Sequence, residues 1–135
     1  MSNPVEYLDL DDMLALAERL LGAPIPLRDV GLLGSAVARP RTTVGGHDAY
    51  PDLWTKAAAL LQSVVNNHAL IDGNKRLGWL ATAVFLDLNA IDVSAISNDD
   101  VFELVMSVAV GGIDLDGIAR RLESLAREAS ENNAP

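Results

Sequence analysis

The 135-residue sequence contains no cysteine. Disulfide bonds and thiolate metal sites are therefore excluded, and a reducing compartment is permitted. The N-terminal segment MSNPVEYLDLDDM has neither the basic stretch nor the apolar core of a signal peptide, and no run approaches the roughly 20 apolar residues of a membrane span. These signals predict neither export nor membrane insertion, so we expect a cytoplasmic protein with no membrane partner.

Basic residues are also scarce. Ten Lys and Arg stand against nineteen Asp and Glu, which gives a formal net charge of −9. Duplex binding draws its affinity from Lys and Arg that neutralise phosphates, so we expect no direct binding of nucleic acid. Against this acidic background the adjacent pair Lys75-Arg76 is either a local anion site or an ordinary solvated helix surface.

The composition is that of an ordered globular protein. Half of the residues are apolar and 21% are charged. A chain of this length is expected to form a single domain over residues 1–135 around one core.

Apolar residues recur with helical spacing along most of the chain. The expected helices run from a cap at Asp9 or Asp11 to Gly22, from near Pro26 to before Pro40, from Pro51 to about His68, from Gly73-Asn74 to about Asn89, from Ser97 or Asn98 to Gly111-Gly112, and from Asp114 or Asp116 into the C-terminal tail. The sequence therefore predicts an all-α fold, a compact single-domain bundle of about six helices.

Residues 39–50 interrupt this pattern. They have no helical period, group β-branched residues together and contain the pair Gly45-Gly46. The segment is expected to form a loop or a short hairpin. Connections of this length often bind ligands, and the plain alternative is a mobile linker.

The stretch HALIDGNKR, from His68 to Arg76, carries the clearest chemical pattern. A helix that opens at Gly73-Asn74 exposes unpaired backbone N–H groups to an anion. Gly73 lets a phosphate approach the backbone, and Asn74 can donate a side-chain N–H to a phosphoryl oxygen. Lys75 and Arg76 add positive charge where the helix dipole disfavours it, which indicates an anionic ligand.

Two further side chains complete a possible active site. A carboxylate such as Asp72, next to bound phosphates, is the usual protein ligand of Mg²⁺. His68 is suited to accept a proton from an attacking hydroxyl. Each residue also has a plain alternative: His68 as a hydrogen-bonded helix end, Asp72 as an N-cap, Gly73 as a turn, and the basic pair as a solvated face.

HALIDGNKR resembles the Fic/Doc signature, whose general form is HxFx(D/E)GNxR. The segments GLLGSAVARP (31–40) and YPDLWTKAAALL (50–61) are similar to what precedes the signature in death-on-curing (Doc) toxins. The resemblance implies a compact helical Fic fold, with residues 39–50 as a flap similar to a β-hairpin that pairs with a target segment by strand addition. At Leu70 the family usually has phenylalanine, and this residue is expected to anchor the loop in the core.

The resemblance also implies roles for the loop. His68 would be the general base, Asp72 the Mg²⁺ ligand, and Asn74, Lys75 and Arg76, with Gly73, the groups that bind the phosphates of ATP. AMP-transferring Fic enzymes typically have a second glycine where this chain has Lys75 and a second arginine where it has Trp79. Doc-like members share the lysine, and they are associated with moving the γ-phosphate of ATP to a threonine of elongation factor Tu.

The resemblance thus predicts a kinase-like toxin that blocks translation and is neutralised by a cognate antitoxin. Some Fic proteins instead carry an inhibitory helix with a Ser/Thr-x-x-x-Glu pattern. Ser124 and Glu128 match its minimal form, but the arginine that such a glutamate pairs with is absent, so inhibition by a separate antitoxin chain is expected. Two alternatives remain, an AMP transferase and a catalytically inactive module that acts with an antitoxin.

Overall fold

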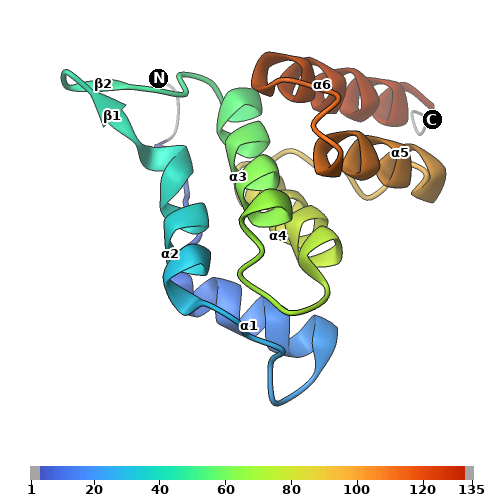
Figure 1. The fold of residues 1–135 in the computed structure, drawn as a ribbon. Helices are drawn as coiled ribbons and strands as arrows, with labels where there is room; N and C mark the ends of the chain where they lie inside the picture. The colour runs from blue at the N-terminus through green and yellow to red at the C-terminus, as the bar shows by residue number, and fades with distance from the viewer. Residues whose placement is uncertain (1–3, 133–135) are drawn as a thin grey trace.

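The computed structural model describes residues 4–132 (Figure 1). Within this range the chain forms six α-helices, a short 3₁₀ turn and one small hairpin. Their bounds are α1 Leu10–Leu21, α2 Val30–Ala38, η1 Arg39–Arg41, β1 Thr43–Val44, β2 His47–Asp48, α3 Leu53–Asn67, α4 Asn74–Leu88, α5 Asn98–Ala109 and α6 Leu115–Asn132. The predicted all-α class, with about six helices and a short hairpin, is confirmed.

Side-chain caps explain where several helices begin. Asp9 accepts a hydrogen bond from the backbone N–H of Asp12, whose side chain accepts from the Asp9 N–H in return. Asp52 starts α3 by accepting from the backbone N–H of Thr55, and Ser97 caps α5. These bonds satisfy N–H groups that have no partner within the helix.

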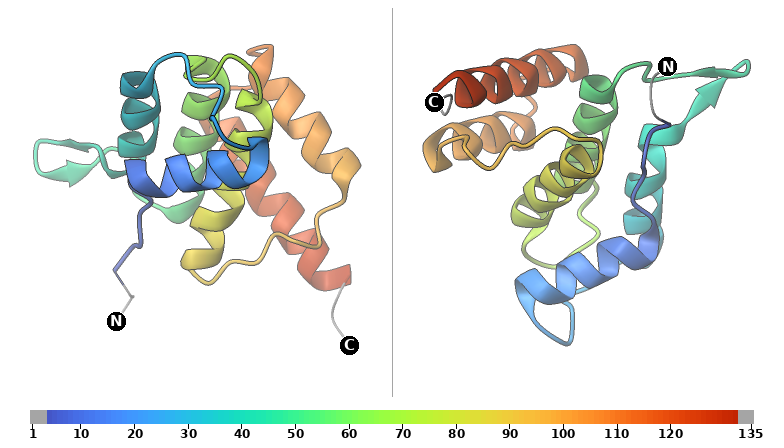
Figure 2. Two further views of the ribbon diagram at one scale, coloured as in Figure 1. Left: turned by 90° about the horizontal axis from the view of Figure 1, so that it is seen from below. Right: turned by 180° about the vertical axis from the view of Figure 1, so that it is seen from behind.

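Helix α3 lies at the centre of the molecule and packs against α2, α4, α5 and α6 (Figures 1 and 2). Most of its side chains are buried, including Leu60 and Leu61. Gly78 lets α4 pack closely on α3, since an added Cβ there would lie 2.7 Å from a methyl carbon of Val65. The central position of α3 fixes the segment that follows it, residues 68–73.

The start of α2 differs from the prediction. The helix begins at Val30, four residues after Pro26, with Asp29 as its N-cap. Residues 22–29 before it are not helical, and Leu27 forms an antiparallel bridge with Leu70. A long-range backbone pairing therefore replaces the first turn that helical spacing alone predicted.

The segment 39–50 forms a hairpin, one of the two predicted outcomes. After η1, strands β1 and β2 pair antiparallel, with Thr43 opposite Asp48 and Val44 opposite His47. The hairpin projects from the helical body at the end of α3 that is far from His68 (Figure 1). Since α3 has 15 residues, its first turn lies about 20 Å from His68, whereas Thr42, at the start of the hairpin, shares a pocket with Asn67.

No helix in residues 4–132 is long and apolar enough to cross a membrane.

Candidate active site

His68 lies at the C-terminal end of α3, where the chain leaves the helix. Its backbone has left-handed angles (φ 54°, ψ 43°), which few residues other than glycine adopt. Its side chain is exposed. The guanidinium of Arg28 donates two hydrogen bonds to the His68 carbonyl oxygen, one from Nε at 2.9 Å and one from Nη2. Arg28 thus holds the turn that presents the imidazole.

The segment before α2, residues 26–29, fixes the rest of this turn. The backbone N–H groups of Arg28 and Asp29 donate to the Ala69 carbonyl at 2.8 and 2.9 Å. The N–H of Ile71 donates to the Pro26 carbonyl at 2.7 Å. Sequence analysis missed Arg28, because its partner lies 40 positions away and no local pattern marks the pair.

Asn74 closes the loop from within. Its Nδ2 donates to the Leu70 carbonyl at 2.9 Å, and its Oδ1 accepts from the Leu70 N–H at 3.0 Å. Leu70 itself is 2% exposed and belongs to the core, so its predicted role as an anchor is confirmed. The Asn74 amide is therefore engaged with the loop, whereas the sequence suggested a direct bond to phosphate.

Helix α4 begins at Asn74, as predicted, and Gly73 is its N-cap with no side-chain cap. The alternative that Asp72 caps the helix is wrong, because its Oδ1 instead accepts from the Gly73 N–H at 2.8 Å. The first intrahelical bond runs from Leu77 to Gly73. Within the described residues, the N–H groups of Asn74, Lys75 and Arg76 thus have no capping partner, and they form a candidate anion site.

Position 73 favours glycine. Its φ is +92°, and an added Cβ would lie 2.8 Å from both methyl carbons of Leu21. The last residue of α1 therefore packs directly behind the candidate anion site, and a side chain at position 73 would have to displace Leu21.

Asp72, Lys75 and Arg76 are all exposed around this helix end. The Asp72 Oδ2 and the Arg76 Nη2 lie 4.0 Å apart, and their side chains are 87% and 60% exposed. No cluster of three or more acidic or histidine side chains that could hold a metal ion occurs in residues 4–132. A single exposed carboxylate beside an anion site suits Mg²⁺ that is bound mainly through phosphates and water.

A cleft of about 600 Å³ opens beside the anion site, between α4 and α5. Asp72, Gly73, Lys75 and Arg76 form its polar end. Mostly apolar side chains line the remainder, among them Leu20, Trp79, Leu80, Val101, Phe102, Val105 and Met106. Its size is that of a small-molecule site. Of the six predicted site residues, Asp72, Gly73, Lys75 and Arg76 line the cleft, whereas His68 and Asn74 do not.

The remaining residues singled out by sequence lie elsewhere or take other roles. Trp79, at the position where the resemblance implies a second arginine in AMP-transferring Fic enzymes, lines the cleft. Ser124 donates to Glu128 at 3.3 Å on α6. That helix lies on the opposite side of the molecule from the loop at 68–73 (Figure 1). An inhibitory role for Ser124 and Glu128 therefore has no geometric support.

The sequence pattern of the Fic/DOC family matches residues 7–86, which include α1, the hairpin, α3 and most of α4. The chain belongs to the Fic/DOC family. It is similar to the protein named Toxin Doc of Mycolicibacterium smegmatis, with 49% identity over 125 residues, which cover 92% of this chain and 96% of that protein. It is thus a Fic/Doc protein of the death-on-curing type.

Proposed function

We propose that this chain is the toxin of a toxin–antitoxin pair and that it transfers the γ-phosphate of ATP to a threonine hydroxyl of a protein, elongation factor Tu, which blocks translation. One observation carries the proposal. The unpaired N–H groups that open α4 lie among Asp72, Lys75 and Arg76 at the polar end of a cleft that can hold a nucleotide. The match to a Doc toxin over almost the whole chain supports the same function.

In the proposed reaction, the phosphates of ATP rest on the α4 N-terminus. The side chains of Lys75 and Arg76 neutralise charge that develops on the phosphoryl oxygens, and the backbone N–H groups add fixed donors. The imidazole of His68 accepts the proton of the target hydroxyl. The hydroxyl oxygen forms a bond to the γ-phosphorus, the bond from that phosphorus to the bridging oxygen breaks, and ADP leaves.

Asp72 is the residue that would hold Mg²⁺. The bound ion would supply further positive charge to the phosphates. Asn74 contributes by fixing the loop, since its amide bonds keep His68 and the anion site at a constant separation along residues 68–74.

The apolar part of the cleft suits the remainder of the nucleotide, and it also offers a surface to an antitoxin. Phe102, at the cleft, is 67% exposed, and Val110 near it is 75% exposed. An antitoxin segment that covers these side chains would close the cleft beside Lys75 and Arg76. Inhibition would then follow from exclusion of ATP.

Purified protein, elongation factor Tu and ATP labelled at either the γ- or the α-phosphate test the reaction. We expect γ-label on elongation factor Tu with wild-type protein and none with His68→Ala. Transfer of α-label instead would identify an AMP transferase, which the presence of Trp79 in place of an arginine makes the less favoured outcome. No transfer of either label, with equal growth of cells that express wild type and His68→Ala, would leave the inactive binding module.

A further inference from the structure

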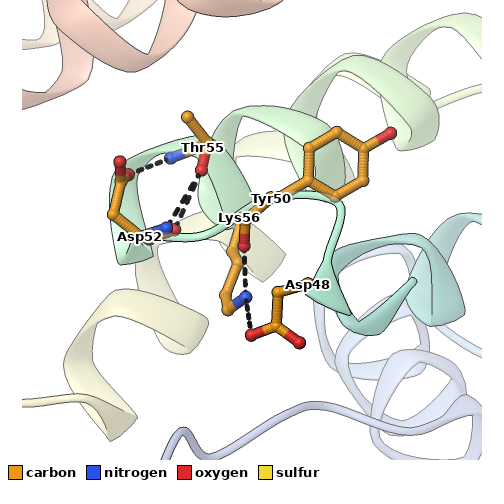
Figure 3. A network of polar contacts seen from close by, with 5 residues as sticks. All are labelled: Asp48, Tyr50, Asp52, Thr55 and Lys56. Carbon is orange, nitrogen blue, oxygen red and sulfur yellow. Dashed lines mark hydrogen bonds and ion pairs between the residues drawn. The ribbon is translucent and has the colours of Figure 1, made fainter. Parts of the chain in front are cut away.

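Among the cations at the base of the flap, Lys56 and Arg39 differ in how their positive charges are surrounded. Lys56, on α3, is 1% exposed. Its Nζ lies 3.1 Å from Oδ2 of Asp48 on β2 and also donates to the Tyr50 carbonyl (Figure 3). The positive charge of Lys56 is thus neutralised within the molecule, as a buried ammonium requires.

Arg39, in η1, is half-buried and has only neutral partners. Its Nε donates to the Tyr50 hydroxyl at 2.8 Å, and its Nη1 donates to Gln62 Oε1 at 2.8 Å and to Ser63 Oγ at 2.9 Å. The guanidinium also lies 5.2 Å from the centre of the Tyr50 ring. No ion pair of Arg39 and no hydrogen bond from its Nη2 occur within residues 4–132.

A polar pocket of about 460 Å³ adjoins this guanidinium. Besides Arg39 it is lined by Ser35, Ala38, Thr42, Ser63 and Asn67, which come from α2, the start of the flap and α3. Hydroxyl and amide groups surround one unneutralised cation, and no carboxylate lines the pocket. Such a lining is suited to bind a carboxylate by charge-assisted hydrogen bonds.

The position of the pocket relates it to the reaction. Thr42 directly precedes β1, and Asn67 directly precedes His68. An extended segment that runs from the flap to His68 therefore passes over the pocket. Ser63 and His68 are five residues apart along α3, about 7.5 Å, and an extended chain covers that distance in about two to three residues.

We propose that the pocket at Arg39 binds an aspartate or glutamate side chain of the target protein, about two to four residues from the hydroxyl that is modified. This inference rests on the proposed function, because it assigns the substrate segment of the same active site. Arg39 would determine specificity without contact to ATP. The competing interpretation is that Arg39 has a structural role only. Its hydrogen bonds to Tyr50 on one side and to Gln62 and Ser63 on the other would then serve to hold Tyr50 against α3.

A binding experiment separates these interpretations without any assay of transfer. The probes are glutamate and glutamine capped at both backbone ends, titrated into wild-type protein labelled with ¹⁵N. The Arg39 Nε–H signal is assigned by its loss in Arg39→Lys. We expect a saturable shift with capped glutamate and none with capped glutamine. Equal shifts with both probes, or no shift, would overturn the inference. The same glutamate-dependent shift at exposed Arg120 would also overturn it and would indicate an adventitious ion only.

A kinetic experiment tests the role in substrate choice. Once mass spectrometry has located the modified hydroxyl, each nearby Asp or Glu of the target is changed to Asn or Gln. One such change should lower kcat/KM of the wild-type enzyme roughly tenfold through KM, the size expected for one charged hydrogen bond. The Arg39→Gln enzyme should have the same lowered kcat/KM with the unchanged target and with that target variant. The matched exposed change Arg120→Gln should behave as wild type.

The outcomes distinguish this inference from the proposed function. If wild-type protein transfers no phosphate to any target, the proposed function fails, and the binding experiment still decides the role of Arg39. If transfer occurs but no carboxylate near the hydroxyl affects KM, the inference fails while the function stands. Should Arg39→Gln not fold, wild-type enzyme with the target variants gives the same decision.

Discussion

Replacement of Asn74 by alanine tests how the loop at 68–73 is held. The Asn74 amide forms both described hydrogen bonds of the Leu70 backbone, at 2.9 and 3.0 Å. Leu70 is 2% exposed, so water cannot replace these bonds without opening the core. A buried donor or acceptor left without a partner costs about 1–3 kcal/mol. Asn74→Ala should therefore lower the free energy of unfolding by about 2–5 kcal/mol, a large part of the 5–15 kcal/mol typical of a domain.

Thermal and denaturant unfolding measure this loss directly. A domain of this size loses about 3–5 °C in Tm per kcal/mol, so Tm should fall by roughly 6–25 °C. The control is Lys75→Ala, which removes an exposed side chain from the same helix turn and should leave Tm of the free protein almost unchanged. If Asn74→Ala unfolded like wild type and lost only the stabilisation by Mg-ATP, the amide would be a phosphate donor and our account of the loop would be wrong.

Three further changes test other parts of the structure. Gly73→Ala should lower stability by about 1–3 kcal/mol in urea unfolding, since its φ of +92° and the leucine side chain of α1 oppose a Cβ; wild-type stability would refute the packing. Asp48→Ala should cost about 3 kcal/mol, because it strands the buried ammonium of Lys56, and the added change Lys56→Met should recover most of this; a double variant as weak as the single one would contradict that reason. Arg28→Gln should lower the transfer rate far more than Tm, since exposed Arg28 orients the His68 turn; an unchanged rate in a kinase assay would remove that role.

Much of the helical architecture could be predicted from sequence, because its signals are local. Asp9 and Gly22 bound α1 as expected, and Ser97 starts α5. The prediction failed at the start of α2, where apolar spacing suggested a helix from Pro26. There the bridge from Leu27 to Leu70 favours an extended chain, and such a pairing over 43 positions leaves no periodic signal.

The candidate site shows the same division. Spacing alone identified the turn at Gly73 and the helix start at Asn74. It could not assign the Asn74 amide to the loop, since a side chain that is able to bond phosphate is equally able to bond a neighbouring carbonyl. Nor could it find Arg28 or the pocket at Arg39, because both depend on how distant segments meet in space.

The central claim is that the loop from His68 to Arg76 transfers a phosphoryl group from ATP. Intact-protein mass spectrometry of elongation factor Tu, after incubation with Mg-ATP and either wild type or His68→Ala, tests it most directly. We predict that wild type adds the mass of one phosphate and that His68→Ala adds none. Addition of the mass of AMP would contradict the claim. So would an elongation factor Tu that stays unmodified by a wild-type protein whose expression arrests cell growth.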